Sequence, residues 1–296
     1  MKKTFPFLLV FSLLLGACGS QTGSETVFTE NNGIKISVSI ASIQWLVDLI
    51  GAEHVQTQSL TTSGDDPHTY EPTPAQMIAM AASDLYFTAG VEFEAVWLPK
   101  FTDANSDLKV VDISEGINRI PVADLHGSVG DEHEGLDPHI WLAPENMRLI
   151  ANNIAATLET MDPENAADYQ LNLADVLAKI VEVDRQLSQM LSQTQRRQFL
   201  IIHPSLGYFA QAYGLQMVPV EVDGQEPSPT ELADILAASK TYAFNTLFFQ
   251  TGTNPVNVQM LAQQAGIDKI VEIDPMTYDW AANMLSIGES LQAALN

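Results

Sequence analysis

Along most of the chain, short apolar runs with the period of strands alternate with amphipathic segments with the period of helices. In the first half, this alternation predicts strands at residues 36–40, 55–60, 85–89 and 108–113. In the second half, it predicts strands at residues 199–202, 218–222, 246–249 and 269–273. Helices are predicted at residues 43–50, 75–82, 230–239, 256–265 and 280–295. Such alternation favours parallel sheets flanked by helices, so we predict an α/β protein.

A different pattern separates these two regions. Asp162-Pro163-Glu164 offers a helix start, and no Gly or Pro follows until Pro204. Apolar side chains then recur at spacings of three and four, at Tyr169, Leu173, Val176, Ile180, Val183, Leu187 and Met190. The stripe predicts a helix of some thirty residues, roughly 45 Å long. A coiled-coil dimer is the competing interpretation, but regular flanking charges are missing.

We therefore predict two α/β lobes, each with a parallel sheet, at residues 34–161 and 197–296. One long helix over residues 162–196 is expected to join them. No repeat of solenoid length is present, so the lobes resemble each other only in architecture.

Residues 1–17 have the pattern of an export signal. Lys2 and Lys3 precede an apolar stretch at residues 5–15, which is shorter than the roughly twenty residues that a membrane span needs. The sequence Leu15-Gly16-Ala17-Cys18 resembles the lipobox of bacterial lipoproteins, so we expect Cys18 to carry the lipid. An ordinary cleavage site beside an incidental cysteine is the alternative. Residues 18–33, rich in Ser, Thr, Gly and Asn, predict a flexible tether.

The composition limits the partners. The chain has 37 acidic and 13 basic residues and a net charge of −24, which argues against nucleic acid or anionic lipid as a binding partner. Cys18 is the only cysteine, so an intramolecular disulfide is excluded.

Four short segments place a metal-type donor beside a proline: Asp66-Pro67-His68, Asp137-Pro138-His139, His203-Pro204 and Asp274-Pro275. The last two follow predicted strands, and the carboxyl ends of parallel strands are where α/β proteins bind ligands. Three imidazoles and one carboxylate would form a four-coordinate site for a cation such as zinc.

Each donor has a structural alternative. A histidine can be a satisfied core residue, and Asp274 can equally begin a turn, because Asp-Pro is common there. Asp66 and Asp137 could accept hydrogen bonds from the ligand imidazoles, or could likewise serve their own turns.

The other histidines divide differently. His54 precedes a predicted strand and is expected at the surface. His126 and His133 lie in a polar, glycine-rich segment at residues 124–135, which is either a solvated loop or a weak secondary metal site.

Taken together, these motifs resemble the cluster A-I group of solute-binding proteins, which serve ABC transporters for zinc and manganese. The matching segments occur in the order and with the spacing of that group, at residues 64–74, 137–144, 203–215, 224–229 and 274–275. The resemblance implies two lobes around a buried metal, with His68, His139, His203 and Asp274 as its ligands. It also implies an ABC permease with its ATPase subunit as partners, a monomer, and an extracytoplasmic protein anchored to a membrane through Cys18.

The donor at the third position bears on the choice of metal. Manganese binders of this group tend to have a glutamate there, whereas this chain has His203, and imidazole suits Zn(II) better than Mn(II). We therefore expect high-affinity capture of zinc, with manganese or iron as the alternative. The segment that carries His126 and His133 is shorter and poorer in histidine than in many members of the group, which weakens a scavenging role. Some members are described as adhesins, but no residue supports adhesion directly.

A zinc hydrolase is the rival class. Such an enzyme keeps three protein ligands and an open coordination position, often with a His-Glu-x-x-His motif. That motif is absent, since His133-Glu134 is followed by Gly135-Leu136-Asp137. We therefore predict a binding protein and not an enzyme.

Overall fold

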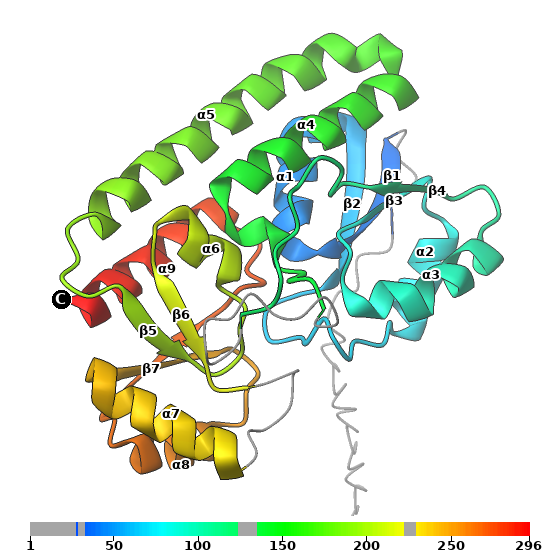
Figure 1. The fold of residues 1–296 in the computed structure, drawn as a ribbon. Helices are drawn as coiled ribbons and strands as arrows, with labels where there is room; N and C mark the ends of the chain where they lie inside the picture. Colours follow the sequence, from blue (N-terminus) through cyan, green and yellow to red (C-terminus); the bar gives the residue numbers. More distant parts are fainter. Residues whose placement is uncertain (1–27, 29–32, 124–134, 222–228) are drawn as a thin grey trace, which may run out of the picture.

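The computed structural model describes residues 28, 33–123, 135–221 and 229–296. Within these residues the chain forms two four-stranded parallel sheets, each flanked by helices (Figure 1). The predicted α/β architecture with two lobes is therefore confirmed. The predictions for the export signal, for Cys18 and for His126 and His133 lie outside the described residues, as does most of the predicted tether.

The first sheet has the strand order β2-β1-β3-β4. Its strands are β1 (Ile34–Ile40), β2 (Val55–Thr61), β3 (Leu85–Thr88) and β4 (Lys109–Asp112). The helices between them are α1 (Ala41–Gly51), α2 (Pro74–Ala81) and α3 (Glu92–Ala104). The central strand β1 is buried from Ile36 onward, as expected of a parallel strand covered on both faces.

The second sheet repeats this topology with the order β6-β5-β7-β8. Its strands are β5 (Gln198–Ile201), β6 (Gln216–Pro219), β7 (Thr246–Gln250) and β8 (Lys269–Ile273). Its helices are α6 (Gly207–Ala212), α7 (Pro229–Tyr242), α8 (Pro255–Ala265) and α9 (Trp280–Leu295). Strand β6 begins two residues before the predicted segment, because residues 216–219 hold the register with β5.

The long helix between the lobes is α5 (Ala166–Leu191), which has 26 residues and a length of about 39 Å. A 3-10 turn (Pro163–Asn165) precedes it, so the α-helix begins later than the predicted start at Asp162. The Asp162 carboxylate instead accepts hydrogen bonds from Asn165 and Tyr169. Most of the predicted apolar stripe is buried, including Tyr169, Ile180 and Leu187.

The sequence pattern does not predict helix α4 (Pro144–Met161), which the structure contains. It packs beside α5, and its buried face carries Met147, Ile150, Ile154 and Leu158 at helical spacing. That spacing was a usable signal. Helix α3 was also not predicted, and its internal Pro99 obscures the pattern.

A single large hydrophobic core joins the lobes. It includes residues of the first sheet, of α4, α5 and α9, and of strand β5. Helix α9 lies against α5, where Gly288 leaves room for Leu187. A smaller cluster packs the second sheet against α7 and α8.

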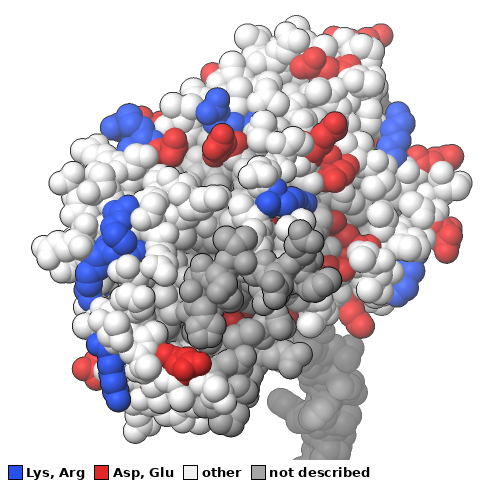
Figure 2. All heavy atoms as spheres, viewed as in Figure 1, with Lys and Arg blue, Asp and Glu red and all other residues white. Residues whose placement is uncertain are grey.

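The surface is acidic overall, but acidic and basic side chains are interspersed over the face shown in Figure 2. Among the helices that the structure describes, none combines the length and the apolar character required to cross a membrane.

Candidate metal centre

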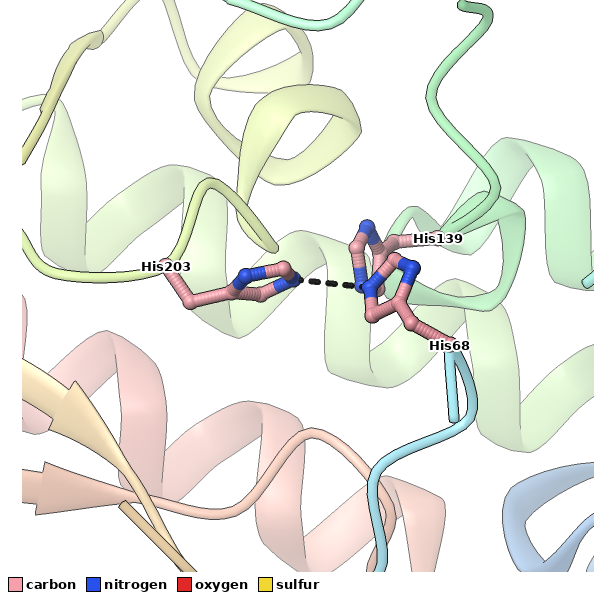
Figure 3. A group of neighbouring side chains, drawn as sticks. All are labelled: His68, His139 and His203. Atoms are coloured by element: carbon pink, nitrogen blue, oxygen red, sulfur yellow. Dashed lines mark hydrogen bonds between the residues drawn. The ribbon is translucent and has the colours of Figure 1, made fainter. Parts of the chain in front are cut away.

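Three of the four predicted donors meet between the lobes. His68 lies in the segment between β2 and α2, His139 immediately precedes a 3-10 turn (Ile140–Leu142), and His203 follows β5. Figure 3 shows their imidazole rings facing one another, although even the closest pair in sequence, His139 and His203, lies 64 positions apart.

The distances between the rings are those of a compact cluster. Nε2 of His68 lies 3.1 Å from Nε2 of His203. The ring centroids are 4.8–5.7 Å apart, and one ligand nitrogen of each histidine lies within 4.8 Å of the other two. His139 is 3% exposed and His203 is 9% exposed, so the cluster is largely sheltered from solvent.

Carboxylates occupy the opposite edge of each ring. The pairs are Nδ1 of His139 with Asp137 at 2.8 Å, Nδ1 of His203 with Glu221 at 2.9 Å, and Nδ1 of His68 with Glu92 at 3.0 Å. In a neutral imidazole whose Nδ1–H donates to a carboxylate, Nε2 carries the lone pair.

This arrangement also suits a cation. At 3.1 Å, Nε2 of His68 and Nε2 of His203 form a hydrogen bond when one of them carries a proton, and both lone pairs are free for a shared ion when neither does. Two nitrogens bound to one tetrahedral zinc at 2.0–2.1 Å would lie about 3.3 Å apart, close to the separation observed here. The spacing of the donors therefore fits one shared divalent ion.

The pKa values of His68 and His139, the two cluster histidines of the N-terminal lobe, shift in opposite directions. Burial acts to lower the pKa of His68, but the hydrogen bond and charge of Glu92 outweigh it, and the pKa of His68 is raised. Burial acts to raise the pKa of Glu92, but the hydrogen bond and the charge of His68 outweigh it, and the pKa of Glu92 is lowered. For His139, burial dominates over the neighbouring Asp137 and lowers the pKa, which favours the neutral form that binds metal.

The fourth predicted donor, Asp274, is not part of the cluster. Among the residues that the structure describes, the group of close donor atoms comprises only the three histidines. The Asp274 carboxylate accepts hydrogen bonds from the backbone N of Met276 at 2.8 Å and from Oγ1 of Thr277 at 2.7 Å. The turn function considered for this residue is thus observed, and its role as a ligand stays a prediction.

The segment that follows β8 is nevertheless fixed close to the element that carries His139. Nε1 of Trp141 donates to the carbonyl of Pro275, and Nε1 of Trp280 donates to the carbonyl of Trp141. Oγ of Ser42 also donates to the carbonyl of Thr277. Asp274 therefore belongs to a segment that is anchored on the N-terminal lobe.

A polar cavity of about 260 Å³ opens beside the cluster. His68, His203, Glu221, Asp65 and Asp66 contribute to its wall. Asp66 does not contact an imidazole, because it accepts hydrogen bonds from the backbone N of His68 and from Thr69. Asp66 and Asp137 were both candidates for a hydrogen bond with a clustered imidazole. Asp137 makes this contact with His139, whereas Asp66 accepts hydrogen bonds within its own turn.

The remaining histidine that was considered lies away from the cluster. Nε2 of His54 pairs with Asp168 on α5 at 3.1 Å, so His54 belongs to the contact between the first lobe and the long helix.

Sequence reasoning missed two of the residues that contact the cluster. Glu221 lies within a predicted strand next to the one that leads to His203, so a carboxylate at that strand end was a usable signal. Glu92 is the first residue of α3, and nothing in the sequence connects it with His68.

Two parallel α/β lobes, a long connecting helix and converging metal donors between the lobes define a class: the bilobed solute-binding proteins that hold a metal ion. Comparison with known proteins makes this specific. The model of the family described as ZnuA, zinc-uptake complex component A, periplasmic, matches residues 36–294, and the chain belongs to that family.

Individual relatives support the assignment. The chain is 26% identical over 280 residues to the manganese-binding lipoprotein MntA of Halalkalibacterium halodurans, a match that covers 92% of this chain and 89% of the relative. It is 27% identical to MtsA of Streptococcus pyogenes, named an iron ABC transporter substrate-binding lipoprotein, over 90% of this chain and 86% of the relative. The solved structure of ZnuA superposes with a TM-score of 0.83 and 33% identity, over 89% of this chain and 100% of that chain.

The family and its solved members are solute-binding proteins, so this chain is a metal-binding protein of that kind and not an enzyme. The names of the family and of these relatives include zinc, manganese and iron. The donors of this chain therefore bear on which of these cations it binds.

Proposed function

We propose that this chain captures Zn(II) with high affinity outside the cytoplasm and delivers it to the permease of an ABC transporter. The observation that carries the proposal is the convergence of His68, His139 and His203 on one point. Three neutral imidazoles form a donor set that suits zinc, whereas manganese prefers sets rich in oxygen. Manganese or iron remains the alternative cargo.

Asp274 is proposed to complete a four-coordinate site. Its two hydrogen bonds within the turn leave further lone pairs on both carboxylate oxygens. Its segment is anchored beside the turn that follows His139, and we propose that this carboxylate reaches the ion when metal binds. A closed set of four ligands suits capture, because it leaves no open position for a substrate.

The partners follow from the same proposal. A permease and its ATPase subunit would receive the metal, and a lipid on Cys18 would keep the protein at the membrane surface. We propose that the protein acts as a monomer, since the long helix packs along its own lobes and does not need a second copy.

Competitive titration of the demetallated protein tests the choice of metal. We expect the parent protein to bind zinc at least about 100-fold more tightly than manganese, and His203→Ala to lose most of that affinity. His203→Glu should reduce the preference for zinc over manganese, because an oxygen donor replaces a nitrogen donor. His54→Ala is the matched control, since His54 pairs with Asp168 away from the cluster, and it should bind zinc like the parent. Manganese binding as tight as zinc binding in the parent would overturn the zinc assignment.

The fourth ligand is tested separately with Asp274→Ala. We expect weaker zinc binding and a coordination number reduced by one protein ligand in X-ray absorption spectra. Unchanged affinity and an unchanged spectrum would remove Asp274 from the site.

A further inference from the structure

Each clustered histidine is paired with a carboxylate through Nδ1, on the edge of the ring that faces away from the other two histidines. Each Nδ1 has its own carboxylate within 3.0 Å: Asp137 for His139, Glu221 for His203 and Glu92 for His68. An imidazole has two nitrogens, and the hydrogen bond at one nitrogen decides which nitrogen is free to bind a metal.

We propose that Glu92 and Glu221, together with Asp137, are positioning residues of the metal centre. Each carboxylate accepts the Nδ1–H of its histidine, fixes the ring and its tautomer, and directs the Nε2 lone pair toward the shared ion. The negative charge of the carboxylate also makes the imidazole more basic, so that its Nε2 lone pair binds the metal more strongly. This inference rests on the proposed function, because it concerns the affinity of the same site.

Each pair lies within one lobe. Glu92 and His68 both belong to the N-terminal lobe, and Glu221 and His203 both follow strands of the second sheet. The orientation of each imidazole is therefore independent of how closely the lobes approach. Between the lobes, His68 and His203 meet directly through their Nε2 atoms, where the ion would lie.

The burial of the carboxylates predicts a ranking of their effects. The side chain of Glu221 is 24% exposed and that of Glu92 is 50% exposed. Because solvent competes for an exposed hydrogen bond, the loss of Glu221 should weaken metal binding more than the loss of Glu92. Asp137 is fully buried and packs against Gly207, so its substitution risks misfolding, and the two glutamates give the cleaner test.

The experiment measures zinc affinity by competition with a chelator for a set of variants. Glu221→Ala should lose about 10- to 100-fold, and Glu92→Ala should lose less. Glu221→Gln should fall between Glu221→Ala and the parent, because its amide oxygen can still accept from Nδ1 but carries no charge. Asp65→Asn is the matched control: Asp65 lines the same cavity but accepts from Thr62, not from a histidine. It should bind zinc within about threefold of the parent.

A second measurement separates positioning from a general effect on stability. Nitrogen NMR of the metal-free protein should show His203 as the Nδ1–H tautomer in the parent and as a mixture of tautomers in Glu221→Ala. The melting temperatures of the two metal-free proteins should be similar.

Two results would overturn the inference. One is parental zinc affinity in Glu221→Ala, and the other is a loss in Asp65→Asn as large as that in Glu221→Gln. Failure of the proposed function would look different, since the parent itself would then not bind zinc, or His203→Ala would bind it as tightly as the parent.

Discussion

Gly207, the first residue of α6, is expected to control the position of His139 without touching it. A Cβ atom at this position would lie 2.2 Å from Oδ2 of Asp137. The other oxygen of that carboxylate accepts from the backbone N of His139 at 2.9 Å and from its Nδ1 at 2.8 Å. Gly207→Ala should therefore push Asp137 by about 1 Å and disturb both of these hydrogen bonds.

Two opposing effects decide the size of the stability change. Overpacking in a buried site typically costs about 1–3 kcal/mol. Alanine in place of glycine in a helix recovers about 1 kcal/mol. The net destabilisation should be about 0–2 kcal/mol, which corresponds to a fall of roughly 2–4 °C in melting temperature for each kcal/mol.

Zinc affinity is the decisive quantity, because the gain in helix propensity does not offset a displaced imidazole. Loss of the carboxylate that orients a metal-binding histidine typically costs about 10- to 100-fold in affinity. Chelator competition and thermal unfolding of Gly207→Ala should show a larger effect on zinc binding than on stability. Gly135→Ala is the control, since a Cβ there meets nothing within 4 Å in the described residues. Parental zinc affinity in Gly207→Ala would refute the link from α6 to the metal centre.

Two further predictions concern the same site. Zinc affinity should fall with decreasing pH from above about 6.5, because the raised pKa of His68 means that protons compete with the metal earlier than at an ordinary histidine. Titrations between pH 8 and 5.5 check this, and an affinity that is constant down to pH 6 would contradict it. Gly252→Ala should lower both stability and zinc affinity, because Gly252 has φ +94° and a Cβ there would lie 2.5 Å from the carbonyl oxygen of Gly64, in the segment that leads to His68. Gly266→Ala, with φ +68° and open space around the Cβ, should lower stability alone, as measured by thermal unfolding and zinc titration.

The two lobes and the three clustered histidines were predictable because local sequence signals agree with the structure. Alternating strands and helices indicated the two parallel sheets, and the apolar stripe indicated α5. His203 follows a buried strand, and proline-bearing turns precede His68 and His139. In an α/β protein these positions come together at the ends of the sheets.

The partners of the histidines were harder to predict because they depend on tertiary approach. Glu92 and His68 are separated by a whole helix and strand, and only the packing of the first sheet brings them within 3.0 Å. Asp66 and Asp137 have the same sequence context, Asp-Pro-His, yet only Asp137 contacts an imidazole. The rotamer of an aspartate at a turn follows from its surroundings, and the tripeptide alone does not determine it.

The shared core limits how far the lobes can separate to release the ion. Trp45 of α1 and Trp280 of α9 belong to different lobes and pack with their ring centroids 5.8 Å apart, and Trp141 and Met276 are buried in the same core. Full exposure of each such side chain would cost about 1.5–3 kcal/mol, so a wide opening that exposed four of them would cost about 6–12 kcal/mol. That is comparable to the whole stability of a typical domain. A bond between zinc and nitrogen is only about 2 Å long, so a shift of an ångström or two between His203 and His68 is enough to break the site. We therefore expect release to need only a small tilt of the lobes, which leaves the core intact.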